Sequence, residues 1–253
     1  MLMLIPMLMQ AQEKTTNNGR IGFEFGSNVF VGETIFPEQI RAYNYNGFFG
    51  FLHSVSDVTQ GLENTYGGIK YESFFYKNRI GLTAGLRFSK SSSKITADER
   101  GKMYFFWLFR QDETTTDYLK IQEIKQKNNY LGIPLEFRYI LKGDRDLFFN
   151  QYFKLGAAVN YCLSTSNSVS FWDTAMNRYA GAVEKQIKKP NAINAWIYPA
   201  YGFKLGKMKN VWFNMEFHFP GFLIGKNAHP FFRSDVGIGA ELSVQIPVNK
   251  IIH

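Results

Sequence analysis

The strongest constraint on this chain is an alternation of apolar and polar residues in which glycines and charges share the polar face. Between residues 79 and 90 one face is apolar, with Ile80, Leu82, Ala84, Leu86 and Phe88. The other face combines small, polar and charged residues, with Gly81, Thr83, Gly85, Arg87 and Ser89. A period of two predicts a β-strand. Apolar side chains on one face and small or charged ones on the other are typical of a transmembrane β-barrel.

The same alternation recurs along the chain and predicts eight strands. They are expected at 20–30, 66–76, 79–90, 128–141, 148–164, 194–206, 211–219 and 233–246. Three connections are long, at 31–65, 91–127 and 165–192, a fourth at 220–231 is intermediate, and short turns alternate with them. Outer-membrane barrels have long extracellular loops and short periplasmic turns. We therefore predict an all-β fold, an antiparallel eight-stranded up-and-down transmembrane β-barrel in the outer membrane of a Gram-negative bacterium.

A soluble eight-stranded barrel of lipocalin type would show the same alternation with the two faces exchanged. The pattern alone does not say which face is inside. Two features favour the membrane: the glycines lie on the charged face, as a crowded lumen requires, and the alternation of loop lengths has no reason in a soluble barrel.

The N-terminal residues 1–11 form a short apolar stretch that ends at the small residue Ala11. We expect a signal peptide over 1–11, cleaved near Ala11, and a barrel domain over 12–253. The alternative is an apolar tail. The sequence contains no run of about 18 apolar residues, so we expect no transmembrane helix.

Composition bounds the partners and the cofactors. The single cysteine, Cys162, cannot form an intramolecular disulfide. His53, His229 and His253 are isolated from one another in the sequence, so we expect no metal and no cofactor. The net charge of +8 favours anionic lipopolysaccharide or acidic glycans as partners. The alternative is a solvated surface with no particular partner. Nucleic acid is disfavoured, because the charges are dispersed and the signal would direct export.

The predicted lumen carries a nearly balanced set of charges and one histidine. Its members are Glu24, Lys70, Glu72, Arg87, Glu136, Arg138, Lys154, Lys204, Glu216, His218, Asp235 and Glu241. The interior of an eight-stranded barrel is just filled by side chains, and buried charges need partners. We therefore predict a salt-bridged, filled lumen, with a narrow charged path for small ions as the alternative.

Two loop segments are candidate interaction sites. Residues 103–109 are too apolar for a free loop, and Tyr104, Phe105, Phe106 and Trp107 would extend the sheet above the membrane or dock on a partner protein. Lys185, Lys188 and Lys189 form a basic cluster that could contact lipopolysaccharide phosphates. For residues 103–109 the alternative is packing against other loops. For the three lysines the alternative is a solvated loop.

Residues that could support catalysis are few. Glu216 and His218 share one predicted face, and a nearby serine would complete a hydrolase set. Both point toward the lumen, however, and the G-x-S-x-G motif is absent. We expect no catalytic residues.

One segment resembles a known family. Residues 129–139, Asn-Tyr-Leu-Gly-Ile-Pro-Leu-Glu-Phe-Arg-Tyr, are similar to the YLEIPLLLKY stretch of the outer-membrane β-barrel family common in Bacteroidetes, which includes PorT-like proteins. Gly132 replaces the usual Glu, and Glu136 replaces an apolar residue. A proline inside a strand is normally confined to edges or bulges, so the Ile-Pro pair is informative. The resemblance implies an outer-membrane barrel of the porin family but no defined activity.

Three functions from different classes follow from these features. The first is a non-enzymatic, membrane-embedded scaffold or accessory protein whose long loops contact envelope partners. The second is transport, as a narrow channel or as a PorT-like helper in protein secretion. The third is a lipid-modifying outer-membrane enzyme.

Overall fold

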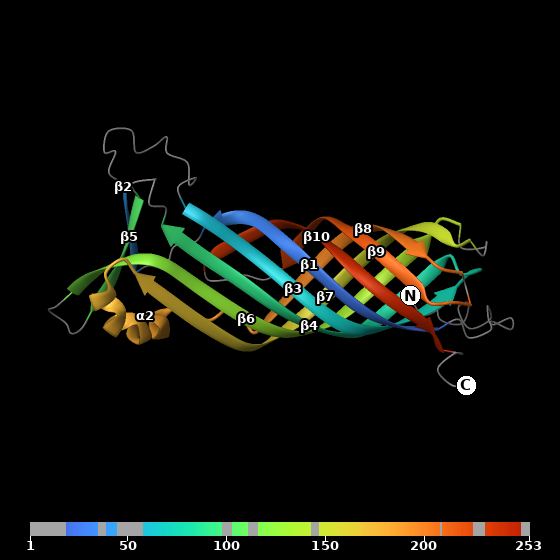
Figure 1. Cartoon of the computed structure of the whole chain (residues 1–253), viewed down its shortest axis with the longest axis horizontal. Coiled ribbons are helices and arrows are strands. Elements are labelled where there is room, and N and C mark those ends of the chain that lie inside the picture. The colour runs from blue at the N-terminus through green and yellow to red at the C-terminus, as the bar shows by residue number, and fades with distance from the viewer. Residues whose placement is uncertain are drawn as a thin grey trace, which may run out of the picture.

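The computed structural model describes residues 19–34, 39–44, 58–97, 103–110, 116–142, 147–207, 209–224 and 231–248, and the expected signal segment 1–11 lies outside them. The fold is all-β with two short helical segments (Figure 1). The strands are β1 (Arg20–Thr34), β2 (Ile40–Asn44), β3 (Val58–Phe75), β4 (Ile80–Ala97), β5 (Met103–Arg110), β6 (Thr116–Ile140), β7 (Phe149–Phe171), β8 (Ile193–Leu205), β9 (Trp212–Ile224) and β10 (Phe232–Pro247). The helical segments are η2 (Thr174–Tyr179) and α2 (Ala180–Gln186). None of the described helices is long and apolar enough to cross a membrane.

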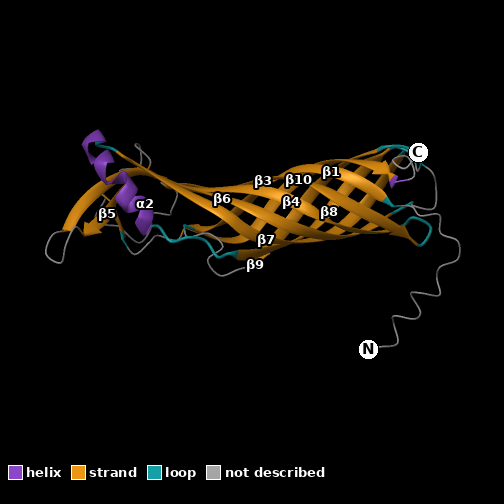
Figure 2. Cartoon of the chain, turned by 90° about the horizontal axis from the view of Figure 1, so that it is seen from below, coloured by secondary structure: helices purple, strands orange, loops and turns teal. Residues whose placement is uncertain are grey.

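The strands form one antiparallel sheet that closes on itself. The hydrogen-bonded order runs β6-β4-β3-β1-β10-β9-β8-β7, and β7 pairs back to β6. We call this closed set of strands the ring (Figures 1 and 2). Closure pairs both edges of every ring strand, which removes the exposed edges that an open sheet would leave. β2 and β5 continue the sheet from the upper part of β6, away from the ring.

Short turns gather at one end of the ring. The turn Tyr76–Arg79 joins β3 to β4, with positive φ angles of 45°, 53° and 60° at Tyr76, Lys77 and Asn78. The segments 141–148 and 206–211 make the connections β6–β7 and β8–β9. Arg20 pairs with both Glu72 and Pro247, so the start of β1 and the end of β10 lie at this end too. We call it the short-turn end.

Several strands are longer than the sequence pattern predicts. β6 begins at Thr116 rather than near 128, and β4 and β7 continue to Ala97 and Phe171. The predicted loops 91–127 and 165–192 are therefore wrong in large part, because they contain strand ends, β5, η2 and α2. The cause is the loss of the outward apolar face. Beyond the apolar part of the ring, outward residues such as Lys94 and Lys127 are polar, so the alternation that marks the lower strands disappears.

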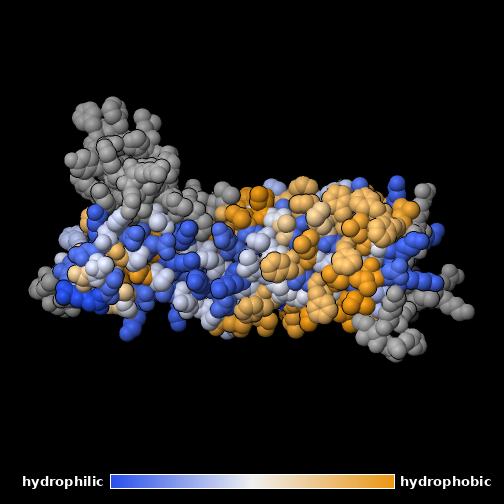
Figure 3. Space-filling view, in the orientation of Figure 1, coloured by the Kyte–Doolittle hydropathy of each residue, from blue (hydrophilic) through white to orange (hydrophobic). Residues whose placement is uncertain are grey.

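The faces of the ring are those of a membrane barrel and the reverse of a lipocalin-type barrel. Large apolar side chains point outward, with Phe25, Leu86 and Phe213 respectively 64%, 59% and 58% exposed. Charged side chains point inward, and Lys70 and Arg138 are 1% and 0% exposed. In the space-filling view, hydrophobic residues form a band around the ring, with hydrophilic residues on the left-hand side of the molecule and again at the right-hand rim, the short-turn end (Figure 3).

Two one-residue bulges shift the phase of the alternation in the upper strands. Gln122 is an extra residue in β6 opposite β7, and Leu163 is an extra residue in β7 opposite β6. Because side chains alternate with a period of two, one extra residue moves the following side chains to the other face. As a result Ile121 and Ile124, three positions apart, are both buried.

Above the bulges the sheet encloses a second, apolar core. Its buried members are Ile40, Ile95, Trp107, Leu119, Ile121, Ile124, Phe171, Val183, Ile187 and Phe231. α2 contributes Val183 and lies against β5, β6 and β7 (Figure 2). Three hydrogen bonds join the helix to the sheet: Trp107 Nε1 donates to Gln186 Oε1 at 3.0 Å, Asn167 Nδ2 donates to Glu184 O at 3.0 Å, and Val169 N donates to Glu184 Oε1 at 3.3 Å. We call this part, made of β2, β5, η2, α2 and the far ends of β4, β6 and β7, the extension.

Candidate functional site

The interior of the ring contains a cluster of buried charges. Its members, the charge cluster, are Glu24, Lys70, Glu72, Arg87, Glu136, Arg138, Lys154, Glu216 and Glu241. Each ring strand except β8 supplies at least one of them, at an inward position of the alternation. Bringing them together therefore requires only that the ring closes with the observed register.

Arg87 contacts three carboxylates of the cluster. Its Nε and Nη2 bind the two oxygens of Glu24 at 2.6 and 2.9 Å, a two-pronged geometry that suits a guanidinium. Nη2 also lies 3.3 Å from Glu136 Oε1 and 3.3 Å from Glu241 Oε2. One guanidinium thus links carboxylates from three strands.

Two lysines bridge the same carboxylates. Lys70 Nζ contacts Glu241 and lies 3.2 Å from Glu24 Oε2 and 3.6 Å from Glu136 Oε2. Lys154 Nζ contacts Glu216 and lies 3.1 Å from Glu136 Oε1 and 3.7 Å from Glu241 Oε2. The ammonium groups therefore alternate with the carboxylates rather than facing an open channel.

Arg138 connects the cluster toward the short-turn end. Its Nη1 lies 3.1 Å from Glu72 Oε2, and its Nη2 lies 3.0 Å from Glu216 Oε1. Gln245 Nε2 also donates to Glu72. The guanidinium carbon of Arg138 stands 4.2 Å from the centre of the Tyr152 ring.

Tyrosine hydroxyls complete the coordination of the carboxylates. Tyr152 OH donates to Glu216 Oε1 at 2.8 Å, and Tyr198 OH donates to Glu136 Oε1 at 2.8 Å. Each of these rings lies against an inward glycine: a Cβ would come within 2.4 Å of the Tyr198 ring at Gly156 and within 2.3 Å of the Tyr152 ring at Gly202. This explains why glycines share the charged face of the strands.

Apolar layers close the lumen on both sides of the charge cluster. Toward the short-turn end, Phe74, Ile140, Tyr152 and Trp212 pack together. The Arg20 guanidinium stacks 3.5 Å from the centre of the Trp212 ring. On the other side, Phe30 and Leu62 pack with Trp196, Tyr198 and Ala200. Among the described residues these two layers and the cluster fill the cross-section of the ring.

A small polar cavity lies beyond the second layer, toward the extension. Its volume is about 20 Å³, and its polar lining includes Asn64, Ser91, Tyr130, Asn160 and Asn194. Asn160 Nδ2 donates to Asn194 Oδ1 at 2.9 Å. The cavity has room for about one water molecule and not for a larger solute.

His218 lies at the level of the second layer. Its Nδ1 is 2.9 Å from Asn28 Oδ1, and its ring is 4.4 Å from the ring of Tyr198. Oxygen or nitrogen atoms of Glu216, His218 and Glu241 lie close enough to share a metal ion. The Lys154 ammonium already binds both of these carboxylates, so this donor set is electrostatically satisfied without a metal.

The predicted lumen residues separate into a central group of nine and three others, which are His218, described above, Lys204 and Asp235. All nine members of the charge cluster are among the predicted residues. Lys204 lies at the short-turn end, where its Nζ donates to Leu147 O at 3.3 Å and stands 4.3 Å from the Trp212 ring. The side chain of Asp235 lies outside the described residues.

Sequence reasoning missed the groups that support the cluster. Arg20, Tyr66, Tyr152 and Gln245 were not predicted as part of it, although each is buried. Their inward phase in the alternation was the available signal. A charge-based choice of lumen residues overlooks neutral donors of this kind.

The two predicted loop sites have different structures. Trp107 is fully buried in the core of the extension, so this residue is not part of an exposed docking patch; burial of the indole stabilises the extension instead. Phe106 is partly exposed, and the side chains of Tyr104 and Phe105 lie outside the described residues.

The basic cluster Lys185, Lys188 and Lys189 is exposed at the end of α2 and just after it. The backbone of this segment is fixed, since Gln126 Nε2 donates to Lys188 O at 3.1 Å. The three lysines are therefore presented to solvent from a defined part of the extension.

Comparisons with known proteins return little. No family model and no curated protein match the chain, so the resemblance of residues 129–139 to a Bacteroidetes family stays a prediction. The chain is similar to a crystal structure of the outer membrane protein OprG from Pseudomonas aeruginosa, with 12% identity and a TM-score of 0.37 over 91% of this chain and 94% of that chain. A TM-score this low does not establish a common topology.

Proposed function

We propose that the ring is an eight-stranded β-barrel that spans the outer membrane of a Gram-negative bacterium. The observation that carries the proposal is the reversed polarity of the ring, with charges inside and large apolar side chains outside. The short-turn end would face the periplasm and the extension would stand outside the cell, as in known barrels.

The size of the apolar belt supports this assignment. In β6 every outward residue from Leu131 to Tyr139 is apolar and exposed. A tilted transmembrane strand needs about 9–11 residues, and this run has that length. Full burial of a large apolar side chain stabilises a protein by about 1.5–3 kcal/mol. Side chains left in water do not contribute this free energy, so a belt of this size is unfavourable on a soluble monomer.

We infer that the protein is a non-enzymatic scaffold or accessory protein whose extension contacts envelope partners. The paired charge cluster and the two apolar layers support a closed lumen rather than a narrow channel. The extension is a folded unit with its own core and not a set of free loops, which suits recognition. The exposed lysines Lys185, Lys188 and Lys189 favour lipopolysaccharide phosphates as one contact.

Gel migration tests the barrel. Protein extracted from outer membranes should migrate as a compact band that resists SDS and should shift on boiling. A detergent-free soluble protein that shows no shift would contradict the proposal. Extension partners could then be sought by crosslinking from Lys185.

Planar-bilayer recording tests the closed lumen. The intact barrel should show no steady conductance, because the ion-paired charge cluster and the two apolar layers occupy the lumen. A large and steady conductance would instead support the channel alternative. Replacing Trp212 with Ala removes one layer only, so this variant should stay closed.

A further inference from the structure

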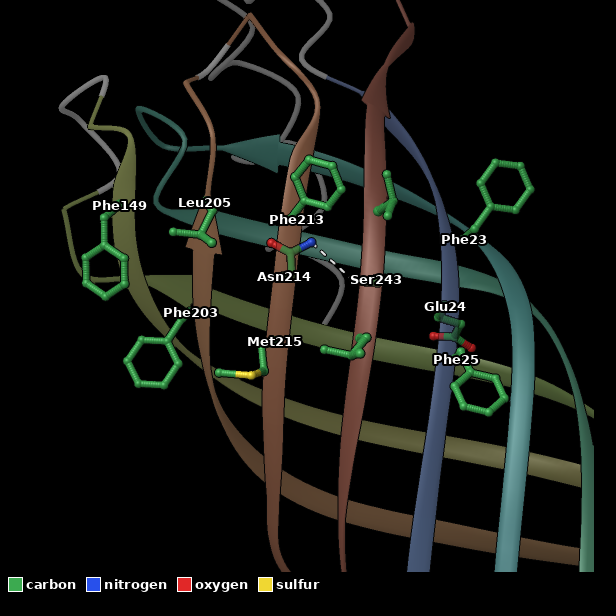
Figure 4. A pocket seen from close by; sticks show the side chains of 12 residues that line it. Phe23, Glu24, Phe25, Phe149, Phe203, Leu205, Phe213, Asn214, Met215 and Ser243 are labelled. Carbon is green, nitrogen blue, oxygen red and sulfur yellow. Dashed lines mark hydrogen bonds between the residues drawn. The ribbon is translucent and has the colours of Figure 1, made fainter.

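The outer surface of the ring has an apolar groove of about 810 Å³ near the short-turn end (Figure 4). Two rows of cross-strand neighbours line it. The row nearer the turns consists of Phe149, Leu205, Phe213, Val244 and Phe23. The second row consists of Phe203, Met215, Leu242 and Phe25. Strand register therefore aligns these side chains across β7, β8, β9, β10 and β1.

The groove has aromatic walls and a largely aliphatic floor. On one side the rings of Phe149 and Phe203 stack with centroids 5.7 Å apart and an interplanar angle of 26°. On the other side stand Phe23 and Phe25, with Met215 on the floor between the two walls (Figure 4). A flexible hydrocarbon chain is the occupant that matches such a surface.

The polar residues that line the groove, Glu24, Asn214 and Ser243, are all buried on the lumen side. Glu24 binds Arg87, and Asn214 Nδ2 donates to Ser243 Oγ at 3.2 Å. A peptide segment in the groove would leave its backbone groups without hydrogen-bond partners, which is costly in an apolar medium. This disfavours a protein occupant and favours a lipid chain.

Two exposed lysines lie in the turn that adjoins the groove. The turn between β8 and β9 directly connects the lining residues Leu205 and Phe213, and it carries Lys207 and Lys209, both exposed. Neither lysine forms a salt bridge with a residue in the described part of the chain. An apolar groove that adjoins two ammonium groups is complementary to an amphiphile with an anionic head.

We propose that this groove and the lysines of the adjoining turn bind one anionic phospholipid. An acyl chain lies between the phenylalanine walls, and the phosphate contacts Lys207 and Lys209. The proposal rests on the proposed function, because only a transmembrane ring with its short turns in the periplasm brings this groove into the phospholipid leaflet. It goes further by naming one site and one class of lipid.

Native mass spectrometry tests the site. The full chain is reconstituted in vesicles with equal amounts of phosphatidylglycerol and phosphatidylcholine, and the lipids that remain after release are identified. The wild type should retain one phosphatidylglycerol molecule. The double variant Lys207→Gln/Lys209→Gln should lower this retention about thirtyfold, since each of the two basic residues near anionic lipid contributes about 1 kcal/mol. Val244→Phe, which fills the groove, should lower the retention of both lipids.

Two matched variants serve as controls. Lys77→Gln/Lys142→Gln removes the same charge from other turns of the short-turn end. Ala157→Phe fills a second outer hollow of about 580 Å³. Neither should change the retention of phosphatidylglycerol. An equal loss in the first control would mean that the rim attracts anionic lipid without a site, which would overturn the proposal.

Insertion is scored separately by the heat-dependent gel shift of every sample. Wild-type protein that fails to insert would refute the proposed membrane barrel. Protein that inserts and shifts, but retains no phosphatidylglycerol or retains both lipids equally, would refute the lipid site alone.

Discussion

The ring and the extension use the same strands with opposite polarity. In the lower part of β6 the outward residue Leu135 is apolar and the inward residue Glu136 is charged. In the upper part the inward residues Ile121 and Ile124 are apolar. If the ring spans a membrane as proposed, lipid selects an apolar outside there, and water selects an apolar inside in the extension. The polarity changes through the residue types, since Ile124 and Glu136 share one phase of β6, and the bulge at Gln122 then brings Ile121 to the same inward face.

The largest expected effect comes from breaking the charge cluster. Glu136→Ala removes the carboxylate that contacts Lys70, Arg87 and Lys154. Removing one partner of a buried ion pair costs about 3–5 kcal/mol, because the other charges stay buried without compensation. We expect this loss in the free energy of unfolding by urea titration in vesicles. A change below about 1 kcal/mol would contradict a buried, paired cluster.

A change of similar size in the extension should stay local. Trp107→Ala removes a fully buried indole, which typically costs about 3–5 kcal/mol. We expect faster proteolysis of α2 and β5, while the heat-dependent gel shift of the ring is unchanged. Phe106→Ala, at a partly exposed neighbour, is the control and should have a smaller effect. Loss of the gel shift would show that the two regions do not fold independently.

An arginine placed on the outer surface should destabilise the ring more than the extension, if lipid surrounds the first and water the second. Leu135→Arg puts a cation on the apolar belt, where it should cost about 2–4 kcal/mol near the bilayer midplane. Gln122→Arg, on the exposed face of the extension, should change stability by less than about 0.5 kcal/mol. Both free energies are measured in vesicles. Equal, small effects would mean that the belt is surrounded by water.

The smallest effect concerns the lysines of the extension. Replacing Lys185, Lys188 and Lys189 with Gln should weaken binding to lipopolysaccharide by at least about threefold, because three exposed ion pairs at about 0.2–1 kcal/mol each contribute together at least about 0.6 kcal/mol. Added salt should abolish the difference. Surface plasmon resonance at two salt concentrations would measure it. An unchanged affinity at low salt would mean that these lysines are solvated and do not bind lipopolysaccharide.

The sequence predicts the ring well because its strands have a uniform phase. Leu131, Glu136 and Lys154 lie on the faces that a simple alternation predicts. The extension could not be predicted in this way. Gln122 and Leu163 reset the phase without any unusual residue to mark the position, and polar outward residues such as Lys94 make the strand ends look like loops.

The groups of the candidate site divide in the same manner. The charged residues of the predicted lumen can be identified from the sequence, because a charge in the middle of a strand is unusual. Tyr66 cannot be identified in this way, because tyrosine is common in strands, although its hydroxyl donates to Glu241 Oε2 at 3.1 Å. The burial of Trp107 also depends on α2, whose contact with β5 spans many residues of sequence.

The length of β6 sets the reach of the molecule. Between Thr116 and Tyr130 this strand rises above the apolar belt, which corresponds to about 50 Å along the strand at about 3.3 Å per residue. β7 runs beside it and pairs with it almost to the end, so the two form a stiff stalk. The stalk would lift α2 clear of the lipid headgroups and hold it at a fixed height among the surface sugars. A partner would then meet α2 far from the bilayer.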